Sequence, residues 1–452
     1  MNPNIFREYD IRGRVPEELN RETAYRLGQC FGAYYVSSGA KRISLGRDCR
    51  LSSPELCTGV IEGLMDAGIH VVEVGMVPTP LLYFSLHHLD VDGGVQITGS
   101  HNPPEYNGFK VCLGKTTIYG EEIQKLRRIG ESGSFPKGKG SVESKEVTQP
   151  YQEEILKGIR CGQIPRRVVL DAGNGVAGLV APELYSRMGI EVEKLFCEPD
   201  GRFPNHLPDP TLPENLKHLV QKVNDTSADL GIAFDGDADR IGVVDRRGKI
   251  IWGDQLLIIF SRDLLKRHPG AKIIGEVKCS QVLYDDIRKH GGMPIMWKAG
   301  HSLIKGKMKE EGALLAGEMS GHIFFAERYF GYDDAIYAGA RLLEILTTEN
   351  KELEELLTGV PSLVSTPEIR MDCPDDKKFQ VVAALASEFK KEYQVIDVDG
   401  ARVVFDGGWG LIRASNTQPV LVLRFEAEDQ KTLQEIQKIF MDKLAKKGLG
   451  VR

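Results

Sequence analysis

Short apolar runs and amphipathic segments alternate along most of the chain, in an order that repeats. Apolar runs ended by glycine or polar residues are typical of buried strands, and segments with a period near 3.6 are typical of helices. In the first repeat a helix is expected from about residue 55 to 67, and the apolar runs span residues 42–48, 68–75 and 94–97. The same order returns in the runs 167–171, 190–196 and 230–234, and again in 272–278, 293–297 and 313–316. These degenerate repeats predict three related mixed α/β domains.

The last part of the sequence follows a different pattern. A helix is expected from about residue 375 to 391, followed by two strands joined at Asp399-Gly400, a strand from 420 to 426 and a closing helix. Because Asp-Gly between apolar runs is a strong hairpin signal, this part is predicted to be a small α+β domain. Stretches without a sustained apolar period, at residues 130–150 and 359–367, and a turn at 245–248 mark the boundaries. We therefore expect domains at residues 1–148, 149–248, 249–362 and 363–452.

The third strand of each repeat leads directly into a polar loop. The loops are Thr98-Gly99-Ser100-His101-Asn102-Pro103, Asp235-Gly236-Asp237-Ala238-Asp239-Arg240 and Gly317-Glu318-Met319-Ser320-Gly321-His322. Ligands of open α/β sheets bind beyond the carboxyl ends of the strands. The three loops are therefore predicted to face one central cleft.

Composition and charge limit the kinds of partner that the protein is expected to bind. The chain has 452 residues, 41% of them hydrophobic and 27% charged, with a formal net charge of -6. This balance argues against nucleic acid or an anionic membrane as a general partner. The sequence has no apolar run long enough to span a bilayer and no basic-then-apolar start, so a cytoplasmic protein is expected. Its eight cysteines include no Cys-x-x-Cys pair, which favours buried thiols over a zinc site or disulfides.

Ser100 is expected to lie exposed at a tight turn, because Gly99 relieves the backbone and Pro103 ends the strand. A hydrophilic turn would look the same. A serine hydrolase is a weaker alternative, since the Gly-x-Ser-x-Gly elbow is absent and His101 is badly placed to act as the base of its neighbour.

The alternating carboxylates of Asp235, Asp237 and Asp239 favour a divalent cation. Alternate side chains of an extended loop share one side, and hard oxygen ligands suit Mg²⁺ better than zinc. An EF-hand is excluded, because Arg240 and Arg246 stand where its Gly and Glu are required. A phosphatase with Asp235 as nucleophile and a solvated acidic turn remain alternatives. Arg240 could neutralise a phosphoryl group that shares the cation.

Other polar clusters are ambiguous by themselves. Glu318 and Ser320 can face the hydroxyl groups of a sugar, or belong to an ordinary turn. The loop Arg413-Ala414-Ser415-Asn416-Thr417 offers donors for a phosphate, although Ser and Asn are also common in turns. By spacing alone Lys110 would be a surface charge. Tyr9-Asp10-Ile11-Arg12-Gly13 is either a functional cluster or a helix cap and turn.

Taken together and in this order, the three strand-end loops and the Arg413 loop resemble the motifs of the α-D-phosphohexomutase superfamily. The segments Phe6-Arg7-Glu8-Tyr9-Asp10-Ile11-Arg12-Gly13 and Pro103-Pro104-Glu105-Tyr106-Asn107-Gly108-Phe109-Lys110 are most similar to its bacterial phosphomannomutase/phosphoglucomutase branch. The phosphoglucosamine mutase branch usually has a different opening, Thr-Ala-Ser-His-Asn-Pro at the serine, and Gln where Met319 stands. This sequence departs from that branch at all three places.

The resemblance implies a heart-shaped enzyme of four domains around a central cleft. Ser100 would carry a phosphoryl group, and Mg²⁺ would lie between an oxygen of that group and the Asp235, Asp237 and Asp239 carboxylates. The phosphoryl group would pass to a hexose phosphate, and the resulting hexose 1,6-bisphosphate would turn end over end and return its other phosphate. The implied catalytic residues are Ser100, His101, Lys110, Arg12, Arg240 and His322. The implied substrate-binding residues are Tyr9, Lys278, His301, Glu318, Ser320, His322, Arg413, Ser415, Asn416 and Thr417.

Lys110 is the expected general acid/base, with a pKa lowered by neighbouring cations. The leading hypothesis is a phosphohexomutase that acts on mannose and glucose phosphates as a monomer or weak dimer. Glucosamine phosphate is the alternative substrate within the class. A metal-dependent sugar phosphatase and a non-catalytic sugar-phosphate sensor are the alternatives outside it.

Overall fold

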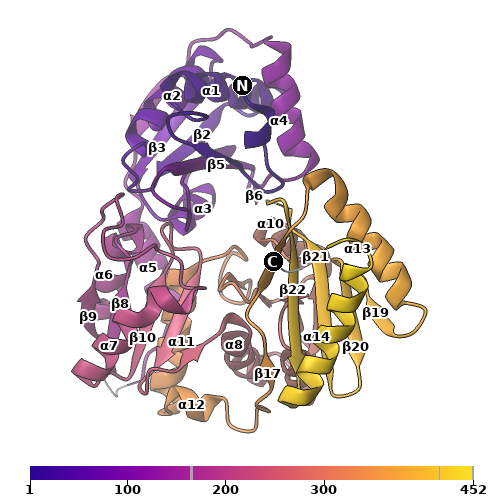
Figure 1. Cartoon of the computed structure of the whole chain (residues 1–452). Helices are drawn as coiled ribbons and strands as arrows, with labels where there is room; N and C mark the ends of the chain where they lie inside the picture. The colour runs from indigo at the N-terminus through magenta and orange to yellow at the C-terminus, as the bar shows by residue number, and fades with distance from the viewer. Residues whose placement is uncertain (163–165, 417, 450–452) are drawn as a thin grey trace.

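The computed structural model describes residues 1–162, 166–416 and 418–449. Its strands form four sheets, each in a separate unit of the chain, and the units follow one another around a common centre (Figure 1). The first unit lies at the top of the view, the second at the left, the third below and the fourth at the right. The three mixed sheets and the antiparallel fourth confirm the predicted fold class. The domain bounds at 148, 248 and 362 stay predictions.

The first unit is built on a 7-stranded sheet in the order β1-β5-β4-β2-β3-β7, with β6 beside β5. Its strands are β1 (Ile11–Arg14), β2 (Arg42–Arg47), β3 (His70–Met76), β4 (Gly93–Ile97), β5 (Tyr106–Leu113), β6 (Thr116–Thr117) and β7 (Ser141–Ser144). Its helices are α1 (Arg21–Ser37), α2 (Ser53–Asp66), α3 (Thr79–His88) and α4 (Glu121–Ser132).

The second unit has the order β12-β11-β10-β8-β9 and the third β14-β13-β15-β16. The second comprises α5 (Thr148–Gly158), β8 (Arg167–Asp171), α6 (Ala181–Arg187), β9 (Glu191–Leu195), α7 (Lys217–Thr226), β10 (Leu230–Phe234), β11 (Ile241–Asp245) and β12 (Ile250–Ile251). The third comprises α8 (Gly253–Arg267), β13 (Lys272–Glu276), α9 (Gln281–Lys289), β14 (Met293–Trp297), α10 (His301–Glu311), β15 (Leu315–Gly317), β16 (Ile323–Phe325), α11 (Ala335–Glu349) and α12 (Leu353–Leu356).

The fourth unit is an antiparallel sheet in the order β17-β22-β21-β20-β19, with β18 beside β22. It comprises β17 (Val364–Ser365), β18 (Ile369–Asp372), α13 (Asp375–Phe389), β19 (Gln394–Ile396), β20 (Ala401–Phe405), β21 (Gly408–Ala414), β22 (Val420–Ala427) and α14 (Gln430–Ala445). Among the helices described here, none is both long and apolar enough to cross a membrane.

The stretch 130–150 is more ordered than its composition predicted. It contains β7, which pairs in parallel with β3 at the edge of the first sheet. All residues of β7 are exposed, so the strand has no apolar alternation from which it could have been predicted.

One hydrophobic core joins the first three units. Leu81, Tyr83 and Phe84 of α3 belong to the same buried cluster as residues of α8 and α11 in the third unit. The fourth unit has its own core and meets the third through a small cluster of Val277, Trp409 and Leu411. The first three units therefore form one packed body, to which the fourth is attached.

Candidate active site

The three strand-end loops occupy equivalent places in their sheets. In each of the first three units, three parallel strands are followed along the chain by an antiparallel neighbour of the third: β5 beside β4, β11 beside β10 and β16 beside β15. The Ser100, Asp235 and Glu318 loops are the connections between these last two strands. Because each chain reversal follows a buried strand, its polar side chains project from the same end of each sheet.

The Ser100 loop and the Asp235 loop meet directly. The Ser100 Oγ donates a hydrogen bond of 2.8 Å to Asp235 Oδ2, across the boundary between the first and second units. Ser100 has a φ of 49°, in the left-handed region that a non-glycine residue enters at a cost of about 1 kcal/mol. The surrounding loop must hold that backbone in place.

His101 lies closer to the serine than the sequence suggested. Its Nδ1 is 3.0 Å from Ser100 Oγ, because the left-handed turn brings the two neighbouring side chains to one side. Burial and the nearby Arg240 and Arg12 hold the pKa of His101 well below its usual range. Arg12 on β1 reaches the same loop and donates a 2.8 Å hydrogen bond to Asn102 Oδ1.

Asp235, Asp237 and Asp239 are fully buried, and one oxygen of each lies within 4.8 Å of the others. In the described part of the chain, Asp237 Oδ1 and Asp239 Oδ1 have no hydrogen-bond partner. Burial, together with the charges of Asp239 and Asp237, raises the pKa of Asp235. Three crowded carboxylates with unsatisfied hard oxygens fit a divalent cation.

Lys110 differs from its predicted state. Its Nζ lies 2.7 Å from Asp237 Oδ2 and also contacts Asp239 Oδ2. Burial alone would lower the pKa of Lys110, but the two aspartates outweigh it and the pKa is raised rather than lowered. The amine is therefore held as an ammonium beside the carboxylates.

His322 and His301 share one carboxylate that the sequence analysis did not single out. The Nδ1 atoms of both imidazoles lie 3.3 Å from Asp333 Oδ2, and their rings stack at 5.4 Å. His322 Nε2 accepts a 3.1 Å hydrogen bond from Arg240 Nε, so the hydrogen of the neutral ring is on Nδ1, facing Asp333. Lys305 neutralises the other oxygen of Asp333 at 2.9 Å.

Tyr9 connects three units at one hydroxyl group. It donates to the carbonyl oxygen of Ala299 at 3.0 Å and accepts from Asn416 Nδ2 at 2.6 Å. Glu318 Oε1 accepts from the backbone N–H of Gly300 at 2.7 Å, beside the tyrosine. Ser320 is half-buried in the same turn as Glu318.

Lys278 and Arg413 lie where the third and fourth units meet. Lys278 Nζ is 3.5 Å from Glu276 and 3.3 Å from Glu368, and the Arg413 guanidinium donates to Asp399 at 2.9 Å. Ser415 accepts a hydrogen bond from the backbone N–H of Gln418. The predicted site residue Thr417 lies outside the described residues.

The structure thus links the predicted residues through contacts between loops of all four units, and it adds residues that the motifs missed. Thr79, at the start of α3, donates to Asp237 Oδ2 at 2.5 Å, and Arg50 bonds the backbone of the Ser100 loop. Asp333 contacts the imidazoles of His301 and His322. Arg50 and Thr79 stand just after β2 and β3, where the strand-end rule could have pointed to them, whereas Asp333 gives no comparable signal.

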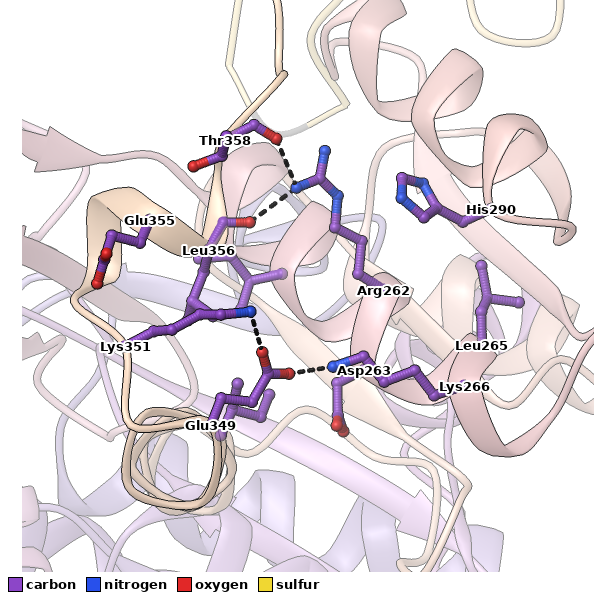
Figure 2. Close-up of a pocket in the computed structure, with 12 residues that line it drawn as sticks. Arg262, Asp263, Leu265, Lys266, His290, Glu349, Lys351, Glu355, Leu356 and Thr358 are labelled. Atoms are coloured by element: carbon purple, nitrogen blue, oxygen red, sulfur yellow. Dashed lines mark hydrogen bonds and ion pairs between the residues drawn. The ribbon is translucent and has the colours of Figure 1, made fainter. Parts of the chain in front are cut away.

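A separate cavity, lined mainly by residues of α8, α11 and α12, is less suited to a ligand (Figure 2). Its cations are partnered within the protein. Lys266 and Lys351 both bind Glu349, and Arg262 donates to the carbonyl groups of Leu356 and Thr358.

Comparison with known proteins gives matches over nearly the whole chain. Family models of phosphoglucomutase/phosphomannomutase match its three alpha/beta/alpha domains and C-terminal domain, at residues 3–137, 149–248, 252–363 and 368–443. A phosphomannomutase/phosphoglucomutase of Pseudomonas aeruginosa is 50% identical over 98% of this chain and 95% of its own. A phosphoglucomutase of Neisseria gonorrhoeae is 49% identical over 97% and 96%. The crystal structure of a phosphoglucomutase/phosphomannomutase family protein from Burkholderia thailandensis has a TM-score of 0.93 and 45% identity, covering 98% and 97%.

Proposed function

Because this chain belongs to the phosphoglucomutase/phosphomannomutase family of the α-D-phosphohexomutase superfamily and is a phosphohexomutase, we propose that it interconverts the 1- and 6-phosphates of mannose and glucose through a phosphoserine at Ser100. The observation that carries the proposal is the 2.8 Å contact between Ser100 Oγ and Asp235. A hydroxyl group beside a buried cluster of carboxylates suits phosphoryl transfer, which needs positioning and charge neutralisation above all.

We assign the cation site to Asp235, Asp237, Asp239 and an oxygen of phosphorylated Ser100. The Oδ1 atoms of Asp237 and Asp239, which accept no hydrogen bond among the described residues, support this assignment, and hard oxygen ligands favour Mg²⁺. When bound, the cation supplies positive charge that offsets the carboxylates and the phosphoryl group.

In the proposed transfer, the bond from phosphorus to Ser100 Oγ breaks and a bond from phosphorus to a sugar hydroxyl oxygen forms. The sugar hydroxyl loses its proton and Ser100 Oγ gains one. We assign Lys110 as the general acid/base, with His101, His322, Arg12 and Arg240 beside it. The 2.7 Å contact of Lys110 Nζ with Asp237 Oδ2 supports placing this amine beside the transferred group.

The remote phosphate is proposed to bind Arg413, Ser415, Asn416 and Thr417, helped by Tyr9, Lys278 and His301. Glu318 and Ser320 would hold sugar hydroxyl groups. Because the hexose 1,6-bisphosphate must fit in two orientations, the pocket should recognise the features that both orientations share. We therefore expect activity with both mannose and glucose phosphates, and less with glucosamine phosphate.

The test compares mannose, glucose and glucosamine 1-phosphates, with the intact mass of the protein measured before and after addition of glucose 1,6-bisphosphate. We expect the 6-phosphate product and a mass gain of one phosphoryl group. Ser100→Ala should lower kcat by roughly 10⁴-fold or more, because no nucleophile remains, while binding of sugar phosphate persists. Free phosphate without 6-phosphate would instead indicate a phosphatase, and full turnover by Ser100→Ala would remove the serine from the mechanism.

A further inference from the structure

Arg50 lies against the Ser100 loop with every N–H group of its guanidinium engaged. It is fully buried and makes no contact that a substrate would replace. Its Nε donates to Asp48 Oδ2 at 3.2 Å, and its two Nη atoms donate to the carbonyl oxygens of Pro103 at 2.7 Å, Tyr106 at 2.9 Å, Ser100 at 2.8 Å and Asn102 at 2.6 Å. One side chain thus fixes four backbone groups of the loop.

The sequence of the loop is shaped around this guanidinium. A Cβ atom at Gly99 would lie 2.5 Å from both Cζ and Nε of Arg50, so in this chain a side chain there would force the guanidinium or the loop to move. The next residue is Ser100, whose φ of 49° is the strained backbone of the site. Arg50 therefore binds the loop at the residue whose backbone conformation is least favourable.

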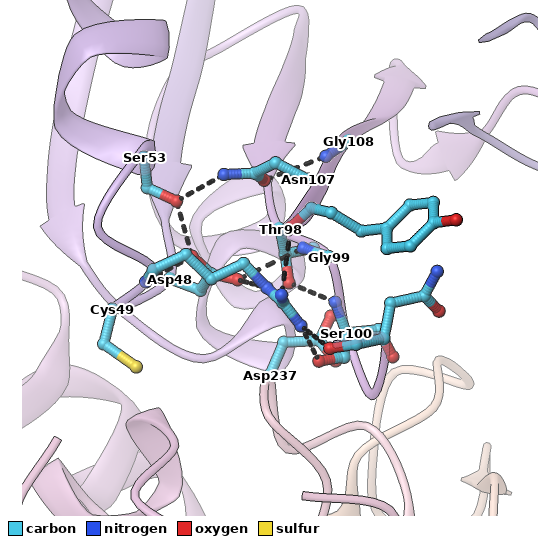
Figure 3. A network of polar contacts seen from close by, with 12 residues as sticks. Asp48, Cys49, Ser53, Thr98, Gly99, Ser100, Asn107, Gly108 and Asp237 are labelled. Carbon is cyan, nitrogen blue, oxygen red and sulfur yellow. Dashed lines mark hydrogen bonds and ion pairs between the residues drawn. The ribbon is translucent and has the colours of Figure 1, made fainter. Parts of the chain in front are cut away.

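Arg50 is held from two further sides. The carboxylate of Asp48 accepts from the Arg50 backbone N–H at 2.9 Å, from Gly99 N at 3.2 Å and from Ser53 Oγ at 2.5 Å. Figure 3 shows Asp48, Ser53, Gly99 and Ser100 of this network together with Asp237. From the second unit, the Phe203 ring lies 5.0 Å from the guanidinium.

We propose that Arg50 is a positioning residue for phosphoryl transfer, which holds Ser100 in the left-handed conformation that points its Oγ at Asp235. The proposal rests on the proposed phosphoserine function. Arg50 acts through the backbone carbonyl groups and not by touching the substrate. It also neutralises their partial negative charge, which would otherwise oppose the charge of a phosphoryl group on the serine.

A lysine cannot make the contacts of Arg50, because one ammonium group cannot reach all four carbonyl oxygens that the planar guanidinium binds. For Arg50→Lys we expect kcat to fall about 100-fold, the loss typical of a reacting group displaced by about 1 Å. KM should stay within about threefold, because the loop proposed to bind the remote phosphate, Arg413 to Thr417, belongs to the fourth unit. A merely structural role would not separate kcat from KM in this way.

The experiment measures kcat, KM and the rate of Ser100 phosphorylation by glucose 1,6-bisphosphate, followed by intact mass, in wild type, Arg50→Lys and Gly99→Ala. Gly99→Ala pushes a methyl group into the guanidinium without deleting a charge, and should lower the same rates. Arg21→Lys is the matched control, because it alters an exposed ion pair between Arg21 on α1 and Glu62 on α2.

The outcomes separate the two proposals. A wild-type chain that gains no phosphate would contradict the phosphoserine, and with it the role of Arg50. If wild type is phosphorylated and Arg50→Lys and Gly99→Ala are phosphorylated at the same rate, the role of Arg50 alone would be overturned. A fall in kcat that comes with a lower melting temperature and a rise in KM would likewise show that Arg50 has only a structural role.

Discussion

Asp333 illustrates how one buried carboxylate organises several charged groups. Lys305 occupies one of its oxygens, while His301 and His322 converge on the other. Burial alone would raise the pKa of Asp333, but Lys305 and the imidazoles hold it well below its usual range. The carboxylate stays ionised, with the Nδ1 atoms of both rings 3.3 Å from its Oδ2.

We therefore expect Asp333→Asn to lower kcat by about 10–100-fold, the range found when a carboxylate that orients a functional histidine is lost. The amide can donate as well as accept, so it no longer fixes the direction of either ring. Steady-state kinetics over a range of pH, with Asp225→Asn as an exposed control, will test this. An unchanged kcat would show that the rings are held by other contacts.

At the scale of elements, the loops behind the Asp235 loop depend on a histidine–carboxylate pair. His206 Nε2 lies 3.1 Å from Asp171 at the end of β8, and a Cβ at Gly173 would lie 3.2 Å from the imidazole. A Cβ at Gly175, two residues on, would lie 2.8 Å from the carbonyl oxygen of Gly236. The pair thus supports the residues against which the Asp235 loop packs.

This pair should make stability depend on pH. Burial lowers the pKa of His206, but the hydrogen bond and charge of Asp171 outweigh burial and raise it above 6.5. The stabilisation is fully present below that value and is lost as pH rises through the folded-state pKa. We expect His206→Gln to lower the melting temperature by about 2–4 °C at pH 6 and by less at pH 9. Calorimetry with the exposed His88→Gln as control measures this, and equal shifts at both pH values would contradict it.

The positions of most parallel strands along the chain were predictable, because buried parallel strands are continuous apolar runs. The edge strand β7 was not, since it buries nothing. The Ser100 and Asp235 loops could be found from their residue types, but their contact could not, because it depends on how two sheets are oriented. Asp333 escaped prediction for the same reason. Arg50 had a signal in its place after β2, but its carbonyl partners could not be foreseen, because a distant segment supplies them.

At the scale of the whole molecule, the fourth unit is attached to the third partly through two of its arginines, which stack on its own indole and donate to backbone carbonyl groups of the third unit. Arg402 and Arg424 lie 3.7 and 5.6 Å from the Trp409 ring, and Trp409 Nε1 donates to Glu426 at 2.7 Å. Arg402 also donates to the carbonyl oxygens of Val277 and Cys279, on either side of Lys278. The position of Lys278 therefore depends on the docking of the fourth unit.

Trp409→Phe keeps a ring but removes the N–H group, and leaves Glu426 without that partner. We expect KM for sugar phosphate to rise about tenfold, because the loss of one hydrogen bond to a charged group shifts the two proposed phosphate-binding segments relative to each other. The fall in kcat should be smaller. Measurement of KM by titration of sugar phosphate, with Trp297→Phe as the control, tests this. An unchanged KM would show that the contacts of Trp409 do not influence substrate binding.

The junction at Tyr9 brings together residues 407 positions apart in the chain, Tyr9 and Asn416, over the backbone of Ala299. In the proposed reaction, a doubly phosphorylated intermediate must leave the serine and return reversed, and it would be lost to bulk water if the fourth unit moved away before it returned. Tyr9 would resist that movement through its two hydrogen bonds, one to the third unit and one from the fourth. In that mechanism, the number of turnovers completed before Ser100 must be phosphorylated again would depend on how long these two hydrogen bonds last.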